Sequence, residues 1–363
     1  MKKSKKWGCA LLALTAALLL TAGGLTAVID PFFHYHAPLP GLAYPMTDQR
    51  YQNDGIVKHF AYDAIITGTS MSENFLASEL DELFGVNAVK VCYSGATFRE
   101  INENLQRAIE ANPDIKMVVR SLDGDMLANK ADAMRTDAEY PEYLYDDSVW
   151  NDVSYVFNKE VLFRHTAKVL QHTLAGNRTT DFDAYSYWAD DLPFGVKTAM
   201  LGYRWDGTKA ESRPYSQSIR NRVVENIRQN VIAIAEANPE IDFYCFFPPY
   251  SVLWWQGASR NGTLERQVDI YITATEELLR CENIHLFSFT GEYDYVVEMN
   301  NYVDLEHYNA DMNSRMLQDM HTGRNRLTQE NYREHWEQVR AFFGGFDYAS
   351  HFTAYGYPLA EAG

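Results

Sequence analysis

Short apolar runs alternate with longer stretches of helical periodicity through most of the chain. The apolar runs, which are typical of buried strands, cover residues 61–67, 88–93, 116–121, 243–247 and 285–288. Between and after them, apolar residues recur with helical spacing, which predicts helices at residues 72–84, 98–111, 217–237, 264–279, 312–320 and 332–343. This alternation predicts an α/β protein whose sheet has about five parallel strands and is covered by helices on both faces.

One short motif appears at two of the predicted junctions. Glu110-Ala-Asn-Pro-Asp-Ile115 recurs almost unchanged as Glu236-Ala-Asn-Pro-Glu-Ile241, each time between a helical stretch and an apolar run. Helices tend to end in front of a proline because its ring disfavours the helical conformation of the preceding residue. The two copies therefore predict the same helix-to-strand junction, used twice within one sheet.

The N-terminus has a different pattern. Four lysines lie before Gly8, and residues 8–29 then run without a charge. A stretch of about 22 residues is long enough to cross a bilayer as a helix. We therefore expect residues 1–30 to be a membrane anchor, with the lysines on the cytoplasmic side and the rest of the chain outside the cell. A cleaved signal peptide is the rival interpretation, because the segment is rich in small residues.

The remaining pattern suggests how the extracytoplasmic part is divided. Residues 31–56 are rich in aromatic residues, proline and glycine, and we interpret them as a juxtamembrane connector. The strand–helix alternation assigns residues 57–127 and 217–345 to one α/β domain. Residues 128–216 interrupt it, with one helical stretch at 158–174, and are expected to form an inserted cap over the active edge of the sheet. Residues 346–363 form a C-terminal tail.

The charge and the cysteine content argue against two classes of function. The chain of 363 residues has 49 acidic and 32 basic side chains, for a net charge of −17. This balance argues against nucleic-acid binding, which needs a basic surface. No CxxC motif or cysteine–histidine cluster is present, so we expect neither a metal site nor a cofactor.

Two separated segments carry the candidate chemistry. Gly68-Thr69-Ser70 follows the first predicted strand and precedes a helix, whereas Asp304-Leu-Glu-His307 lies near the end of the domain. If the two segments meet, Ser70 can act as a nucleophile, His307 as its base, and Asp304 as the carboxylate that orients the imidazole. The alternative is that these are ordinary turn residues, because Gly and Ser are common in turns.

The order and spacing of these motifs resemble the SGNH (GDSL-like) hydrolase superfamily. Gly68-Thr69-Ser70 matches its first block with Thr in place of Asp, Ser94-Gly95 matches the second, and Asp304-x-x-His307 matches the last. The resemblance implies a flavodoxin-like three-layer α/β/α fold. It also implies that the backbone N–H groups of Ser70 and Gly95 stabilise an oxyanion.

One block departs from the family pattern. Where the superfamily has an asparagine after the third strand, this chain reads Ser121-Leu-Asp123-Gly-Asp125. An ionised carboxylate cannot donate a hydrogen bond to an oxyanion. Either another donor replaces the asparagine, for example from the cap, or the site is weakened. Besides these residues, we consider five candidates for the substrate cleft: Thr69, Asp123, Asp125, Tyr250 and Tyr308.

Within the superfamily, the anchor and motifs look most like bacterial cell-surface proteins of teichoic-acid D-alanylation and exopolysaccharide O-acetylation. Those proteins work beside a membrane-bound O-acyltransferase. The resemblance therefore implies serine-dependent acyl transfer or ester hydrolysis on a surface polysaccharide or a teichoic-acid-like polymer. A catalytically degenerate domain that binds glycan or an acyltransferase is the alternative.

Overall fold

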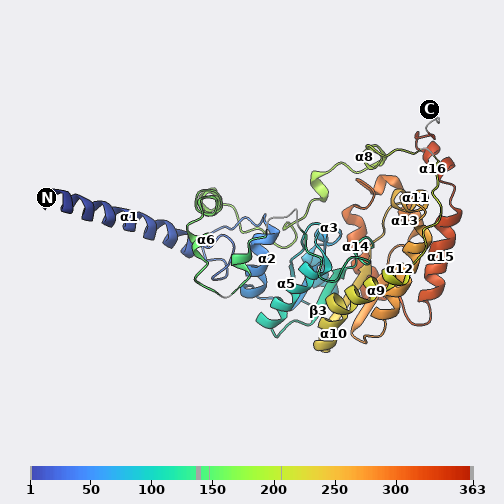
Figure 1. Ribbon diagram of the computed structural model, residues 1–363, viewed down its shortest axis with the longest axis horizontal. Coiled ribbons are helices and arrows are strands. Elements are labelled where there is room, and N and C mark those ends of the chain that lie inside the picture. Colours follow the sequence, from blue (N-terminus) through green and yellow to red (C-terminus); the bar gives the residue numbers. More distant parts are fainter. Residues whose placement is uncertain (1, 136–139, 147, 206, 360–363) are drawn as a thin grey trace.

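The computed structural model describes residues 2–135, 140–146, 148–205 and 207–359. Its first helix, α1 (Lys2–Ile29), projects away from the body of the molecule (Figure 1). The segment Lys5–Ile29 is long and apolar enough to cross a membrane. The end of the predicted connector, residues 31–56, belongs to a helix that the sequence pattern did not reveal, α2 (Gln49–His59), which continues into the predicted α/β domain.

The body is built on one sheet of five parallel strands, as predicted. The strands are β1 (Ala64–Thr67), β2 (Ala88–Lys90), β3 (Met117–Ser121), β4 (Asp242–Phe247) and β5 (Ile284–Ser288). Their order is β2-β1-β3-β4-β5, with Ile65 of β1 opposite Val89 on one side and Val118 on the other. This order places a topological switch point between β1 and β3, where ligands of doubly wound sheets usually bind.

Helices follow the strands much as the periodicity predicted. The main ones are α5 (Phe98–Ala111), α9 (Gln217–Ile227), α12 (Leu264–Leu278), α14 (Ala310–Thr322) and α15 (Tyr332–Gly345). Shorter ones are α10 (Ala233–Ala237), α11 (Val252–Arg260), α13 (Tyr293–Val297) and α16 (Tyr348–Ala354). The helix expected at 72–84 is two helices, α3 (Ser70–Glu73) and α4 (Ala77–Phe84), because Asn74 leaves the helical path between them.

Both faces of the sheet are buried under apolar side chains. On one face, Ile65, Val118 and Phe243 belong to a core that includes residues of α5, α12 and α15. On the other face, Ile66, Val119 and Phe246 belong to a second core with residues of α4, α14 and α16. Burial on both faces explains why these strands appear in the sequence as continuous apolar runs rather than alternating ones.

Residues 128–216, the expected cap, contain only short elements in their described part. These are η1 (Glu142–Leu144), α6 (Val153–Val156), η2 (Val161–Thr166), α7 (Ala167–Leu174), η3 (Ala189–Asp191) and α8 (Val196–Ala199). The helical stretch expected at 158–174 corresponds to η2 and α7. Its start packs beside α1, whereas the later part of the segment runs towards α8 at the far end of the molecule (Figure 1).

Candidate functional site

Ser70 lies at the carboxyl edge of the sheet, just after β1. The turn that presents it depends on Gly68, whose φ is +133°. A Cβ atom at this position would lie 2.3 Å from Ser121 Oγ and 2.6 Å from Ser72 Oγ, so only glycine fits. Thr69 then caps α3, and its hydroxyl accepts a hydrogen bond from the Met71 amide.

The loop that carries the Asp-x-x-His motif reaches back to this turn. The distance from Ser70 Oγ to His307 Nε2 is 2.8 Å, and that from His307 Nδ1 to Asp304 Oδ2 is 2.7 Å. Asp304 also accepts hydrogen bonds from the backbone N–H groups of Glu306 and His307, each at 2.8 Å. The imidazole is thus held between a serine hydroxyl and a carboxylate, an arrangement that can move a proton from serine to histidine.

Electrostatics keep Asp304 ionised. Burial alone would raise the pKa of this carboxyl, but the hydrogen bond and charge of His307 and the two backbone N–H donors outweigh it, so the pKa is lowered. An ionised Asp304 accepts a hydrogen bond from the N–H group at Nδ1 of His307, which leaves the lone pair of Nε2 facing Ser70.

Asp123 supports the serine turn from below. It accepts hydrogen bonds from Thr69 Oγ1 at 2.8 Å, from Ser121 Oγ at 2.9 Å and from Tyr250 at 3.4 Å. Burial raises the pKa of Asp123, although the three hydroxyl donors oppose this effect. Through Ser121, whose Oγ accepts from the Thr69 amide, this network fixes both the backbone and the side chain next to Ser70.

Four of the five substrate-cleft candidates lie under the site rather than in front of it. Thr69, Asp123, Tyr250 and Tyr308 are all buried, and each has its hydroxyl or carboxylate bonded to protein. Tyr308, for example, donates to the carbonyl of Met71 at 2.8 Å. These positions favour supporting roles, and direct contact with a substrate stays a prediction for them.

The fifth candidate, Asp125, is exposed and faces a cavity beside the loop that carries Asp304 and His307. This cavity has a volume of about 380 Å³ and is lined by Asp125, Glu306, Trp254, Tyr203, Arg260 and Arg266 among others. Burial and the neighbouring Asp125 raise the pKa of Glu306 to about 9. Because Glu306 precedes His307 directly, the cavity adjoins the candidate catalytic loop.

The loop after β2 brings Gly95 to the same edge. The Tyr93 amide donates to the carbonyl of Gly68 at 2.9 Å, which holds this loop against the serine turn. Gly95 has φ +62°, and a Cβ atom there would lie 2.4 Å from Nη1 of Arg135. A guanidinium from residues 128–216 therefore covers Gly95, and Arg135 was not identified from the sequence.

Two further residues near the site were missed. The ring of Trp188 packs edge-on against His307, with centroids 5.4 Å apart. Its backbone N–H and that of Ala189 donate to Asn74 Oδ1 at 3.0 and 3.1 Å, which fastens this stretch over the break between α3 and α4.

Lys90 is fully buried, and its ammonium donates to the carbonyls of Glu73, Phe75 and Asp183. A lysine inside an apolar strand run was a signal that the sequence did offer.

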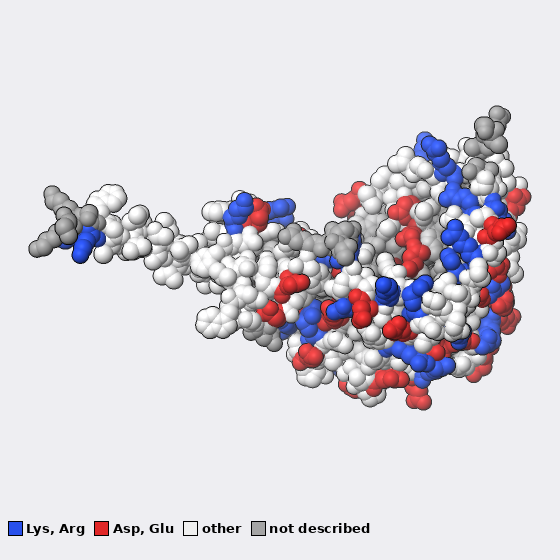
Figure 2. Space-filling model, viewed as in Figure 1, with Lys and Arg blue, Asp and Glu red and all other residues white. Residues whose placement is uncertain are grey.

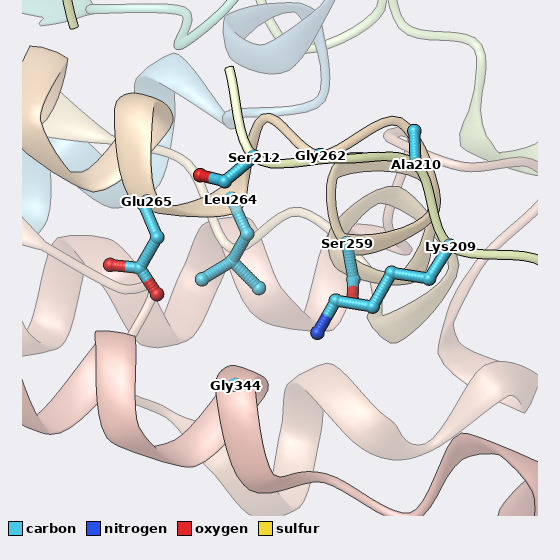
Figure 3. A pocket seen from close by; sticks show the side chains of 8 residues that line it. All are labelled: Lys209, Ala210, Ser212, Ser259, Gly262, Leu264, Glu265 and Gly344. Carbon is cyan, nitrogen blue, oxygen red and sulfur yellow. The ribbon is translucent and has the colours of Figure 1, made fainter. Parts of the chain in front are cut away.

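Another cavity is not lined by Ser70, Asp304 or His307. It has a volume of about 220 Å³, and the side chains of Lys209, Ser259 and Glu265 are among those around it (Figure 3). None of its lining residues belongs to the turn that carries Ser70 or to the loop that carries Asp304 and His307. Among the described residues, no group of His, Cys, Asp and Glu side chains is arranged to hold a metal ion.

No family model matches the chain, and no curated protein matches it. One solved structure that is similar to part of it comes from Streptococcus pneumonia and is described as a candidate platelet activating factor. It has 10% sequence identity and a TM-score of 0.38, and the match covers 76% of this chain and 90% of the other.

Proposed function

We propose that this protein is a serine-dependent acyl-transfer enzyme or esterase of the SGNH type, with a three-layer α/β/α domain. The observation that carries the proposal is the continuous hydrogen-bonded chain from Ser70 to His307 to Asp304, at 2.8 and 2.7 Å. Residues far apart in sequence meet here at the switch point of a parallel sheet, where ligands usually bind. Residues that only form turns do not require three side chains to be aligned in this way.

The geometry suggests a two-step reaction. Ser70 Oγ attacks the carbonyl carbon of an ester while its proton passes to His307 Nε2, and Asp304 stabilises the imidazolium. The tetrahedral oxyanion accepts hydrogen bonds from the N–H groups of Ser70 and Gly95. Collapse breaks the bond to the leaving alcohol, which takes the proton from His307. Water or an acceptor hydroxyl then attacks the acyl-serine in the same manner and regenerates Ser70.

Arg135 is our candidate for the donor that replaces the missing asparagine. The carboxylate of Asp123 accepts three hydrogen bonds from hydroxyl groups. As an acceptor, it cannot donate the hydrogen bond that an oxyanion needs. Arg135 Nη1 donates to the carbonyl of Ser94 at 2.7 Å, so the guanidinium is held on the loop that would bind the oxyanion and brings positive charge to it.

The site of action follows from α1. We propose that this helix anchors the protein in the cell membrane with its lysines in the cytoplasm and the α/β domain outside. Tethering raises the local concentration of the domain near envelope polymers. This favours a cell-surface polysaccharide or teichoic-acid-like polymer as substrate, and a membrane-bound O-acyltransferase as partner.

A second function is favoured by one observation. A buried carboxylate stands where the superfamily has a donor, which is compatible with a domain that binds glycan or an acyltransferase without turnover. A serine-reactive fluorophosphonate separates the two. We expect it to label the wild-type protein and not Ser70→Ala. Equal labelling of the two proteins contradicts the enzymatic proposal, and glycan binding without any labelling supports the binding role.

A further inference from the structure

The end of the molecule next to α1 exposes a group of large apolar side chains. We call residues 149–174, which contain α6, η2 and α7, the juxtamembrane surface. Trp150 is 89% exposed, Phe163 77%, Leu174 88% and Val149 72%. Soluble proteins seldom expose so many large apolar groups in one place unless the surface contacts a partner or a membrane.

This surface is packed directly on the last turns of α1. The α6 and η2 segments contact α1, and a Cβ atom on Gly23 would lie 3.0 Å from the ring of Phe157. Figure 2 shows uncharged surface continuing from α1 onto the adjoining end of the body.

The junction is fixed by buried polar contacts. Asp30 follows α1 and accepts hydrogen bonds from the backbone N–H groups of His34, Tyr35 and His36. It also accepts from the hydroxyl of Tyr155 in α6 at 2.6 Å, while Tyr44 donates to the carbonyl of Ile29 at 2.7 Å. The direction of α1 is therefore coupled to the position of the juxtamembrane surface.

The length of α1 sets the depth of this surface. Residues 7–21 are apolar and exposed, and from residue 22 onwards the helix is partly covered by the body. About 15 residues of helix span about 22 Å. A bilayer has a hydrocarbon core of about 30 Å, so about five more residues of α1 must lie within it. Gly23, against which the ring of Phe157 packs, is one of those residues.

The composition of the surface matches a lipid interface. Lys159, Arg164 and Lys168 are exposed there and outnumber the one exposed acidic residue of η2 and its approach, Glu160. This local excess of positive charge contrasts with a net charge of −17 for the chain. The helix made by η2 and α7 is seen end-on in Figure 1, where α1 lies in the plane, so it runs across the anchor as an interfacial helix does.

We propose that the juxtamembrane surface is immersed in the outer interface of the bilayer that α1 crosses. Its apolar side chains would contact acyl chains, and its lysines and arginine would contact anionic headgroups. This inference rests on the proposed membrane anchor. Two contacts with the bilayer would hold the α/β domain at a fixed height and orientation, which a single flexible tether does not provide.

Quenching by brominated lipids tests the proposal. In full-length protein with Cys9→Ser, single cysteines replace Trp150, Phe163, Leu14 in α1, or Leu201, which is 84% exposed near α8. Each is labelled with bimane and reconstituted in vesicles of phosphatidylcholine and phosphatidylglycerol, with or without bromine on the acyl chains. We expect strong quenching at positions 14, 150 and 163 and none at position 201.

The label at position 14 distinguishes failure of the proposed lipid contact from failure of the proposed membrane anchor. Quenching at position 14 with none at positions 150 and 163 overturns the juxtamembrane surface as a lipid contact and leaves the anchor in place. Absence of quenching at position 14 overturns both the anchor and the interfacial contact.

Discussion

The hydroxyl of Thr69 donates a 2.8 Å hydrogen bond to the carboxylate of Asp123. Both residues belong to blocks in which the sequence departs from the SGNH pattern: Thr69 stands in place of Asp, and Asp123 lies in the stretch Ser121–Asp125, which lacks the expected Asn. In the fold they contact each other beneath Ser70. The two departures therefore act as a pair, in which an acceptor just after β3 holds a donor next to Ser70.

This pair gives a first prediction. Thr69→Val keeps the shape of the side chain but removes both hydrogen bonds of its hydroxyl, so Asp123 and the Met71 amide each lose a partner and the serine turn loosens. We expect about 1–2 kcal/mol of destabilisation and fluorophosphonate labelling that is slower by about tenfold. Thr322→Val, whose exposed hydroxyl bonds only within its own helix, is the matched control. Similar labelling rates for both variants would show that the Thr69–Asp123 contact does not position Ser70.

The glycine that forms the serine turn gives a second prediction. In Gly68→Ala the new methyl group overlaps Ser121 Oγ and Ser72 Oγ, and φ is +133°, so the turn must rearrange. We expect labelling of Ser70 to fall by at least about 100-fold. Gly85→Ala is the control, because Gly85 has φ +69° but no atom within 4 Å of the added Cβ, and it should cost only about 1 kcal/mol. Comparable losses in the two variants would contradict a specific role for Gly68.

The buried ammonium of Lys90 gives a third prediction. Lys90→Met leaves the carbonyls of Glu73, Phe75 and Asp183 without their donor, which should destabilise the protein by about 3 kcal/mol or more. Urea denaturation measures the change. Lys116→Met removes an exposed lysine paired with Asp63 and should have little effect. A small loss for Lys90→Met would mean that Lys90 does not tie β2 to the α3 turn and to Asp183.

Glu306 gives a prediction about pH. Burial and Asp125 raise its pKa to about 9 in the folded protein, from about 4.3 when unfolded. Between these values the folded state keeps a proton that the unfolded state releases, so the contribution of Glu306 to stability falls as pH rises. Glu306→Gln has no ionisable group at this position and so lacks this pH-dependent loss of stability. The Tm of the variant minus the Tm of the wild type should therefore increase progressively from pH 5 to pH 9.

Asp125→Asn is the companion variant for that measurement. Without the neighbouring carboxylate, Glu306 ionises more readily, so the difference between Asp125→Asn proteins with and without Glu306→Gln should be smaller at high pH. A constant difference in Tm between Glu306→Gln and wild type across this range would contradict the raised pKa.

The sheet could be predicted from the sequence because its strands are buried on both faces and stand out as apolar runs. The repeated Asn-Pro motif also marked the real ends of α5 and α10, which stop at Ala111 and Ala237. The break at Asn74 could not be predicted, because it depends on hydrogen bonds from Trp188 and Ala189, which are distant in sequence. Short-range periodicity carries no information about such contacts.

The candidate site was likewise predictable where sequence motifs mark it and not where it depends on contacts between distant segments. Ser70, Asp304 and His307 were found from motifs, whereas Arg135 and Trp188 lie in the irregular segment 128–216, where no periodic pattern fixes their position. The burial of Tyr250 and Tyr308 was also hidden, since a tyrosine in a loop can face either the solvent or the core. Their places are decided by tertiary packing.

The proposed mechanism requires that Ser70 form a covalent acyl intermediate with the help of His307. The direct measurement is mass spectrometry of the intact protein and its peptides after acid quenching of a reaction with an activated acetyl ester. We predict one added acetyl group, located on Ser70, which is absent from Ser70→Ala and strongly reduced in His307→Ala. An adduct of equal yield in Ser70→Ala, or one located on another residue, would contradict the account.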